Sequence, residues 1–329
     1  MAEIKKILIA NRGEIVQRAI RTIREMGKKS VAVYSAGDKN ASYLKHADEA
    51  VCIGGPKSKD SYLNIPAIIT AAEMTGCDAI FPGYGFLSEN QDFVEICRLH
   101  NIKFIGPSVE VMEKMADKSK AKEEMIRAGV PVVPGSKGSV HSVTEGRKVA
   151  LEIGYPIMAK AAAGGGGRGM RLIKEESEFD QLFMAASSEA LAAFGDGTMY
   201  LERFINNPRH IEVQVVGDAH GNAIHIGERD CSLQRRHQKV IEESPAILLN
   251  DETRAKLHDV AVKATKYLKY EGAGTFEFLA DDKQNIFFME MNTRLQVEHP
   301  VSEMVSGIDI VELMIKVAEG EKVPPQESI

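Results

Sequence analysis

The sequence lacks several features that would assign it to a specialised class of protein. It has no tryptophan, no low-complexity tract and no apolar run of 18 residues, which excludes a transmembrane helix. Its cysteines form no C-x-x-C pair, and no H-x-x-x-H or mixed Cys/His cluster predicts a zinc site. The net charge of −6 disfavours nucleic acid as the main partner. We therefore expect neither a membrane nor nucleic acid among its partners.

The four cysteines, Cys52, Cys77, Cys97 and Cys231, are widely spaced, which is typical of reduced thiols in a cytosolic protein. The first residues, 1–6, lead directly into a predicted strand, so we expect no leader peptide and a cytoplasmic location. Cys231 lies in a polar stretch that invites a nucleophile hypothesis, but no base is clearly paired with it. A structural thiol is the favoured interpretation.

The composition is that of an ordinary globular protein, with 27% charged and 44% hydrophobic residues, and 329 residues suffice for two or three domains. Strands alternate with helices in the N-terminal third, which predicts a parallel, doubly wound α/β sheet. The strands expected there are Lys6 to Ala10, Ser30 to Tyr34, Ala50 to Ile53, Ala79 to Phe81 and Lys103 to Ile105.

Glycine and proline residues between Gly129 and Gly135 mark a boundary after a predicted helix, Ser108 to Ala128. A small α+β unit with a glycine run follows, and a third unit begins near Asn207 and ends with a helix at Ile308 to Glu319. The division that we predict is an N-terminal domain at 1–115, a linker helix at 116–131, a glycine-rich lid at 132–204 and a C-terminal domain at 205–329.

Polar and apolar residues alternate without a break from Phe287 to Glu298. In an extended segment the polar side chains share one face. They are Glu290, Asn292, Arg294, Gln296 and Glu298, and Glu277 lies in a similar run nearby. Acids on paired strands repel one another unless a cation lies between them, and oxygen ligands suit magnesium. The pattern indicates a metal-assisted site for an anion; a half-exposed strand with a solvated face is the alternative.

A glycine run at residues 164–167 continues through Arg168 and Gly169 and matches G-x-G-x-x-G. A dinucleotide fingerprint must open a helix, but Met170 to Ile173 has the pattern of a strand. The run therefore predicts a hairpin whose free amides close over phosphates as a lid, with a plain surface loop as the alternative. Lys160 precedes the run and is placed to meet a phosphate, although a lone lysine is more often solvated.

Two further segments allow both a functional and a structural interpretation. In the predicted extended stretch Gln234 to Ile241, Arg235, His237 and Lys239 share a face and need a counter-anion, with a solvated basic face as the alternative. The turn at residues 82–85 leaves a strand end, where ligands gather in α/β sheets, although a structural turn is favoured. Ser88 and Gln91 predict a capping box for the next helix.

Seven strings, in order, resemble the biotin carboxylase family of ATP-grasp ligases, and the likeness covers essentially the whole chain. They are I-A-N-R-G-E-I (9–15), P-G-Y-G-F-L-S-E-N (82–90), K-A-A-A-G-G-G-G-R-G-M (160–170), N-P-R-H-I-E-V-Q (207–214), E-R-D-C-S-L-Q-R-R-H-Q-K (228–239), G-A-G-T-F-E-F (272–278) and E-M-N-T-R-L-Q-V-E-H-P (290–300). The resemblance implies an N-terminal doubly wound domain, a glycine-rich lid and an incomplete C-terminal ATP-grasp domain. One glycine usual in the family's loop is Ala163 here.

The resemblance also implies roles for particular residues. The ligands implied for Mg²⁺ or Mn²⁺ are Glu277, Glu290 and Asn292. The residues implied to bind ATP, besides Glu277 and Glu290, are Lys118, Lys160, Gly164, Gly165, Gly166, Gly167, Glu202, Arg203, Phe204, Ile205, His210, Gln234 and His237. The residues implied to bind bicarbonate are Lys239, Arg294, Gln296 and Val297. Glu298 matches the base that deprotonates bicarbonate, and it joins Arg294 and Lys239 as a catalytic residue.

The activity implied is ATP- and bicarbonate-dependent carboxylation of biotin on a carrier protein through carboxyphosphate, the first half-reaction of acetyl-CoA carboxylase in fatty acid biosynthesis. The partners implied are a biotin carboxyl carrier protein, carboxyltransferase components and, through Arg21 and Glu25, a second copy of the full-length chain. Family members continue beyond the point that matches Ile329, so a C-terminal truncation is implied. The alternatives are a component of pyruvate carboxylase, a truncated form that binds ATP without carboxylating, and another ATP-grasp ligase. A nicotinamide oxidoreductase is disfavoured because residues 11–13 supply only one glycine.

Overall fold

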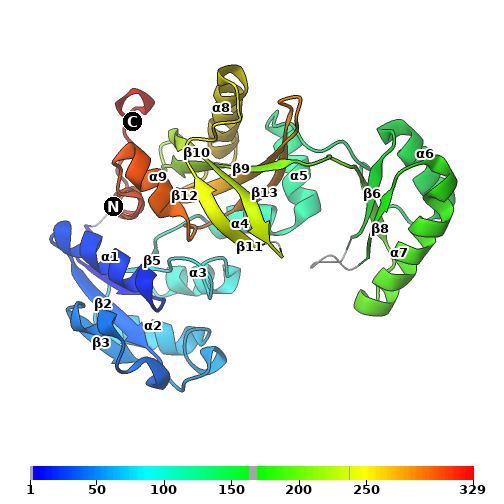
Figure 1. Ribbon diagram of the computed structural model, residues 1–329. Coiled ribbons are helices and arrows are strands. Elements are labelled where there is room, and N and C mark those ends of the chain that lie inside the picture. The colour runs from blue at the N-terminus through cyan, green and yellow to red at the C-terminus, as the bar shows by residue number, and fades with distance from the viewer. Residues whose placement is uncertain (1–2, 163–168, 237) are drawn as a thin grey trace. The chain divides into compact units, whose positions relative to one another are not determined.

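The computed structural model describes residues 3–162, 169–236 and 238–329, which form two compact units (Figure 1). The larger unit combines Met1–Val130, Arg209–Phe278 and Glu290–Ile329, and the smaller one combines Pro131–Pro208 with Leu279–Met289. Among the helices described, none is both long and apolar enough to cross a membrane.

The N-terminal part of the larger unit is a five-stranded parallel sheet in the order β3-β2-β1-β4-β5. Its strands are β1 (Lys6–Ile9), β2 (Lys29–Tyr34), β3 (Glu49–Cys52), β4 (Ala79–Phe81) and β5 (Lys103–Phe104). Ile7 and Ile9 of β1 pack in one core with α1 (Glu14–Glu25), whereas Leu8 packs in a second core with α2 (Ile65–Met74) and α3 (Gln91–Leu99). Successive side chains of a strand face opposite ways, so helices cover both faces. The doubly wound α/β prediction is confirmed.

The C-terminal part of the larger unit is built on a second five-stranded sheet, in the order β11-β10-β9-β12-β13. Its strands are β9 (Arg209–Gly217), β10 (Ala223–Arg235), β11 (Gln238–Glu243), β12 (Gly272–Ala280) and β13 (Ile286–Asn292). The helix α8 (Asp251–Tyr267) connects β11 to β12 and lies against β9 and β10 (Figure 1). Two more helices, α9 (His299–Ser306) and α10 (Ile310–Ala318), follow β13. Val216 of β9 and Ile310 of α10 share the core that contains α1, so both parts of this unit are packed together.

The smaller unit contains a three-stranded antiparallel sheet with two helices. Its elements are α6 (Val143–Ile153), β6 (Ile157–Ala161), β7 (Met170–Ile173), α7 (Phe179–Phe194) and β8 (Met199–Arg203), with the strands in the order β7-β6-β8. Phe179 and Phe183 stack on one another in its separate core. This agrees with the α+β architecture expected around the glycine run, whereas residues 163–168 lie outside the described part of the chain.

Two helix predictions are wrong in detail. The single helix predicted from Ser108 to Ala128 is two helices, α4 (Val109–Ala116) and α5 (Lys118–Arg127), because Asp117 has an extended backbone with ψ of 117°. The linker helix predicted at 116–131 accordingly starts at Lys118 and stops at Arg127. The capping box predicted for α3 is also absent: Asn90 is the N-cap and accepts from the Phe93 amide, while the buried Ser88 hydroxyl has no partner among the described residues.

Two extended segments were also predicted too long. The stretch from Gln234 to Ile241 is a hairpin, with a turn after β10 where Arg236 has a positive φ of 52°, so Arg235 and Lys239 lie on two paired strands. The strand predicted from Phe287 to Glu298 ends at Asn292, and α9 starts at His299. The alternation of polar and apolar residues continues beyond the strand, into the irregular segment at residues 293–298. Some side chains of that segment are buried, which produces the same polarity pattern as a strand.

Candidate active site

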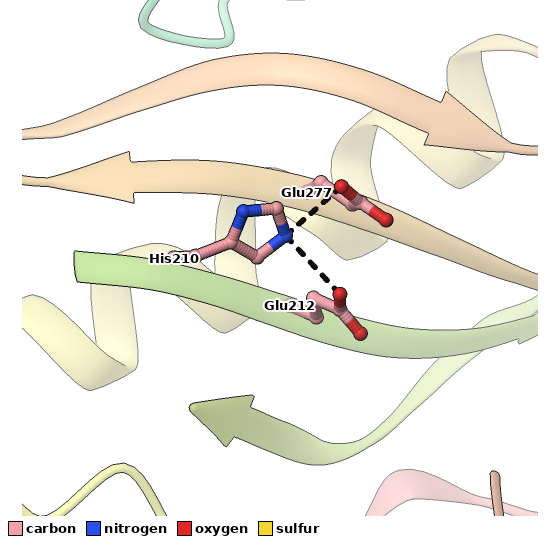
Figure 2. Close-up of side chains that lie close together, drawn as sticks. All are labelled: His210, Glu212 and Glu277. Atoms are coloured by element: carbon pink, nitrogen blue, oxygen red, sulfur yellow. Dashed lines mark hydrogen bonds and ion pairs between the residues drawn. The ribbon is translucent and has the colours of Figure 1, made fainter. Parts of the chain in front are cut away.

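Three side chains from two neighbouring strands form the centre of the candidate site. His210 and Glu212 are two residues apart on β9 and face the same way, toward Glu277 on β12 (Figure 2). The Nε2 atom of His210 lies 2.9 Å from Glu277 Oε2 and 3.2 Å from Glu212 Oε1. Both carboxylates are buried, so the imidazole bridges two acids that are shielded from water.

Lys239 brings a second cation to the same acids. Its Nζ lies 2.6 Å from Glu298 Oε1 and 3.0 Å from Glu277 Oε1, and it also forms an ion pair with Glu212. The three carboxylates of Glu212, Glu277 and Glu298, here termed the acid cluster, belong to residues that are 0%, 4% and 8% exposed. Acids this close need cations between them, and in this structure an ammonium and an imidazolium supply that charge.

The titration behaviour follows from this arrangement. Burial alone would lower the pKa of His210, but hydrogen bonds to Glu212 and Glu277 outweigh it and raise that pKa to about 9. Burial also opposes charge on Lys239, yet the carboxylates of Glu212 and Glu277 raise its pKa above the usual range. For Glu277, burial is again outweighed, chiefly by His210, and its pKa is lowered. All of these groups are therefore charged at neutral pH.

Arg294 is held at one side of the acid cluster by an anchor from the N-terminal sheet. Its Nε donates to Glu89 Oε2 at 2.9 Å, and its Nη2 donates to Asn292 Oδ1 at 2.8 Å. The other oxygen of Glu89 accepts from the Thr293 amide at 3.0 Å. Asn292 in turn donates from Nδ2 to Glu277 Oε1 at 2.7 Å, which connects Arg294 to the acid cluster.

The predicted metal ligands have the donor chemistry that Mg²⁺ or Mn²⁺ requires. Glu277 offers a buried carboxylate, and Asn292 contacts it directly. Glu290 lies two residues before Asn292 on β13 and therefore on the same face of that strand; it is half-buried. Two carboxylates and one amide oxygen on adjacent strands fit a hard cation. His210 and Glu212 of β9, together with Glu277 of β12, form a second set of potential metal ligands.

The remaining predicted site residues fall into three groups. Gln296 is buried and donates to Glu277 Oε1 at 3.0 Å, whereas Val297 is exposed. Gln234 is exposed on β10 and faces Lys239 across the hairpin register. In the smaller unit, Lys160 forms an ion pair with Glu202, Arg203 donates to Ile153 O, and the amide of Phe204 donates to Pro156 O, with the half-buried Ile205 following.

Several predicted residues lie outside what the structure describes. They are Gly164, Gly165, Gly166, Gly167 and His237, together with the side chain of Lys118. Their roles stay predictions.

Three residues of the site received no role in the sequence analysis, namely Glu89, Glu212 and Arg229. Each lies inside one of the strings that carried the resemblance, at positions 82–90, 207–214 and 228–239. A signal existed for Glu212, because it follows His210 at the i+2 spacing of a strand and so shares its face. Arg229 sits in an acidic, polar stretch that gave no indication of complete burial.

Cys231 has the environment of a structural thiol. It is fully buried, and burial raises its pKa well above the usual range, with the nearby Glu212 acting in the same direction. Its sulfur lies close to carboxylate oxygens of Glu212 and Glu298. A thiolate next to two carboxylates is disfavoured, which argues against a nucleophile.

Two family models match the chain. The model described as "Biotin carboxylase, N-terminal domain" matches residues 3–112, and the one described as "Carbamoyl-phosphate synthase L chain, ATP binding domain" matches residues 117–326. Among curated proteins, a biotin carboxylase of Nostoc is 57% identical over 96% of this chain and 71% of its own length. A chloroplastic biotin carboxylase of Arabidopsis thaliana is also 57% identical, and the chain covers 59% of it.

Solved structures show the same similarity. A biotin carboxylase from Campylobacter jejuni, in complex with βγ-ATP, is 67% identical with a TM-score of 0.90, over 99% of this chain and 73% of that one. The biotin carboxylase domain dimer of 2-oxoglutarate carboxylase from Hydrogenobacter thermophilus, with MgADP and bicarbonate, is 50% identical with a TM-score of 0.87, over all of this chain and 73% of that one.

Proposed function

We propose a specific reaction for this chain, which belongs to the biotin carboxylase family of ATP-dependent ligases: ATP-driven carboxylation of biotin on a carrier protein, with bicarbonate as the carbon source. The observation that carries the proposal is the 2.6 Å contact between Lys239 Nζ and Glu298 Oε1. A carboxylate beside a fixed cation can take a proton from an anion that the cation holds. Bicarbonate is such an anion.

The geometry supports the following roles. Lys239 and Arg294 hold bicarbonate, and Glu298 accepts its proton. The resulting carbonate oxygen forms a bond to the γ-phosphorus of ATP while the bond to the β-phosphate oxygen breaks, which releases ADP and gives carboxyphosphate. When bound at Glu277, Glu290 and Asn292, Mg²⁺ or Mn²⁺ supplies positive charge that stabilises the transferring phosphoryl group.

The second stage uses the same cations. Carboxyphosphate breaks down to CO₂ and phosphate, and the phosphate takes the proton from the ureido nitrogen of biotin. The guanidinium of Arg294 stabilises the negative charge that develops on the ureido oxygen, and the nitrogen then forms its bond to CO₂. Lys118 and Lys160 are proposed to bind the nucleotide phosphates, and the run from Gly164 to Gly167 is proposed to close over them as a lid that excludes water. His210, Gln234, His237 and residues 202–205 are proposed to lie around the nucleotide.

The direct test is ATP hydrolysis that depends on bicarbonate and is stimulated by free biotin. Arg294→Ala should abolish the stimulation because no other cation is assigned to the ureido oxygen. An Arg294→Ala variant with an undiminished stimulated rate would contradict the role given to this residue. Arg98→Ala is a suitable control, since Arg98 forms only an exposed ion pair with Glu95.

A second candidate function is Mg-ATP binding without carboxylation. The chain spans 71% of the Nostoc relative and 73% of the Campylobacter one. Calorimetry of Mg-ATP binding separates the two candidates, since binding with no biotin-stimulated turnover favours the second.

The similar proteins include biotin carboxylases and a 2-oxoglutarate carboxylase subunit. We propose acetyl-CoA carboxylase as the parent system, with pyruvate carboxylase as the alternative; the biotinylated protein that co-purifies would distinguish them.

The proposed partners are a biotin carboxyl carrier protein and carboxyltransferase components, and the proposed location is the cytoplasm. A homodimer of the full-length form is proposed through α1, where Arg21 and Glu25 are four residues apart, exposed, and on the same face of the helix. The domain division at 115, 131 and 204 is likewise kept as a proposal.

A further inference from the structure

Arg229 is a fully buried guanidinium directly behind the acid cluster. It lies on β10 opposite Glu212 of β9 in the strand register, and it is 0% exposed. Its Nη2 donates to Gln296 Oε1 at 2.7 Å and Glu212 Oε2 at 3.1 Å. Its Nη1 donates to Gln214 Oε1 and Ser302 Oγ, both at 2.9 Å. One charged group thus reaches two side chains that face the site.

Stability alone gives a poor account of this residue. Its five acceptors include only one carboxylate, and its Nε has no hydrogen-bond partner among the described residues. A buried charge with incomplete pairing pays a desolvation penalty that its partners do not fully offset, and apolar residues of similar volume are often as stable or more so. The guanidinium is therefore better explained by what it does to its neighbours.

Its first effect is on the orientation of Gln296. A guanidinium has only donors, so Gln296 must present its amide oxygen to Arg229. The NH₂ end then points to the other side, where it donates to Glu277 Oε1 at 3.0 Å. Without Arg229, the amide could turn over and place its oxygen against that carboxylate, which is repulsive.

Its second effect is on Glu212. Arg229 takes Oε2, which leaves Oε1 toward His210 and Lys239. Burial would raise the pKa of Glu212, but His210, Arg229 and Lys239 together hold it well below its usual range. A single nitrogen of the guanidinium, Nη2, thus sets both the acceptor that faces Lys239 and the donor that faces Glu277.

We propose that Arg229 is a positioning residue that acts through Gln296 and Glu212 to preorganise Glu277, the member of the acid cluster that would hold a divalent cation. This rests on the proposed function, because the cation is the one that Glu277 would share with ATP. Side chains behind metal ligands typically change metal affinity 10- to 100-fold when removed.

The test is Mn²⁺ binding to the 329-residue chain, without nucleotide, followed by electron paramagnetic resonance. Arg229→Met is expected to weaken Mn²⁺ binding at least roughly tenfold, whereas Arg229→Lys, which restores the charge but not the fork, should recover part of that loss. Ser302→Ala is the matched control, since Ser302 accepts from Nη1 of the same guanidinium and not from Nη2, which contacts Gln296 and Glu212. It should bind Mn²⁺ within about twofold of the unsubstituted chain.

The route through Gln296 gives a second, independent readout. Gln296→Leu should reproduce most of the loss, and the double variant Arg229→Met/Gln296→Leu should bind little more weakly than Arg229→Met alone, because the two act on one contact. If Arg229→Met does not fold, as judged by circular dichroism, Arg229→Lys takes its place: it should bind Mn²⁺ more weakly than the unsubstituted chain, and unchanged affinity would overturn the proposal. Affinity unchanged in folded Arg229→Met or in Gln296→Leu would overturn the proposal, as would additive losses in the double variant.

The outcomes for Arg229 and for the proposed function are separable. A chain that binds Mn²⁺ and shows the Arg229 effect, but does not hydrolyse ATP with bicarbonate, would count against the function and leave the positioning role supported. An Arg229→Met variant that hydrolyses ATP at the normal rate would count against the positioning role and leave the proposed function supported. No detectable Mn²⁺ binding by the unsubstituted chain would overturn the positioning role as stated.

Discussion

Glu89 and Arg294 lie 205 residues apart in the sequence, yet Glu89 Oε2 accepts a hydrogen bond from Arg294 Nε at 2.9 Å. Glu89 belongs to the loop that follows β4 of the parallel sheet, and Arg294 follows β13 of the second sheet. The N-terminal sheet therefore contributes directly to the position of a residue with a proposed catalytic role. This contact gives a first prediction.

Glu89→Gln should lower bicarbonate-dependent ATP hydrolysis by about fivefold, corresponding to roughly 1 kcal/mol. The substitution keeps the shape of the side chain but removes the charge that holds the guanidinium. The expected loss of rate is small because the Glu89 side chain is 42% exposed and solvent screens its ion pair with Arg294. Steady-state kinetics would measure it, with Glu95→Gln, from the exposed pair on α3, as the control. Equal rates for the two variants would show that Glu89 does not matter.

Lys239→Met should destabilise the metal-free chain by about 3–5 kcal/mol, because it leaves buried carboxylates without their ammonium. Excess Mg²⁺ should restore part of the loss by supplying positive charge to the same oxygens. Denaturant unfolding with and without Mg²⁺ would measure both effects. Lys263→Met, which removes only an exposed helix ion pair, should show neither. A variant that loses stability but gains nothing from Mg²⁺ would argue against a shared cation site.

The raised pKa of His210 predicts a loss of stability at alkaline pH. Because its folded pKa, about 9, lies above the unfolded value near 6.5, the stabilisation is complete below pH 6.5 and is lost as pH rises through 9. The loss should be on the order of 2–3 kcal/mol. His210→Gln should remove this dependence, whereas His100→Gln, on the surface beside Glu73, should retain it. The free energy of unfolding of each variant, measured from about pH 6 to 10, would test this prediction. A His210→Gln chain that still loses stability at alkaline pH would contradict it.

The four cysteines should differ sharply in reactivity. Cys52 is exposed, whereas burial raises the pKa of Cys77 to about 11 and of Cys97 to about 12, and raises that of Cys231 further. Only thiolates react rapidly with alkylating agents. Brief treatment with iodoacetamide, followed by mass spectrometry, should therefore label Cys52 first, and unfolding should expose the rest. Rapid labelling of Cys231 in the folded chain would revive the nucleophile hypothesis.

Periodicity was sufficient for the N-terminal sheet but not for every helix. Buried runs such as Lys6 to Ala10, each followed by an amphipathic segment, predict parallel strands because both patterns are local. The helix α8 was missed, although Leu257, Val260, Ala261 and Ala264 follow helical spacing and Asn250 caps its first turn.

The candidate site could be assembled only in part from the sequence. Spacing along one strand placed Glu290 and Asn292 on a common face, and the resemblance supplied the roles. The contacts of Glu89 with Arg294 and of Arg229 with Gln296 arise from tertiary packing of segments 205 and 67 residues apart, which local patterns do not encode. The complete burial of Arg229 also runs against the usual rule for charged residues, so composition offered no hint of it.

Glu277 Oε1 already holds the ammonium of Lys239 at 3.0 Å. A divalent cation held by Glu277 would compete with the ammonium for this carboxylate and would weaken its contact with Lys239. The ammonium of Lys239 would then be available to bind bicarbonate. Metal and bicarbonate should consequently favour each other's binding by the same factor, a reciprocity that thermodynamics demands of any two ligands coupled through one movable group.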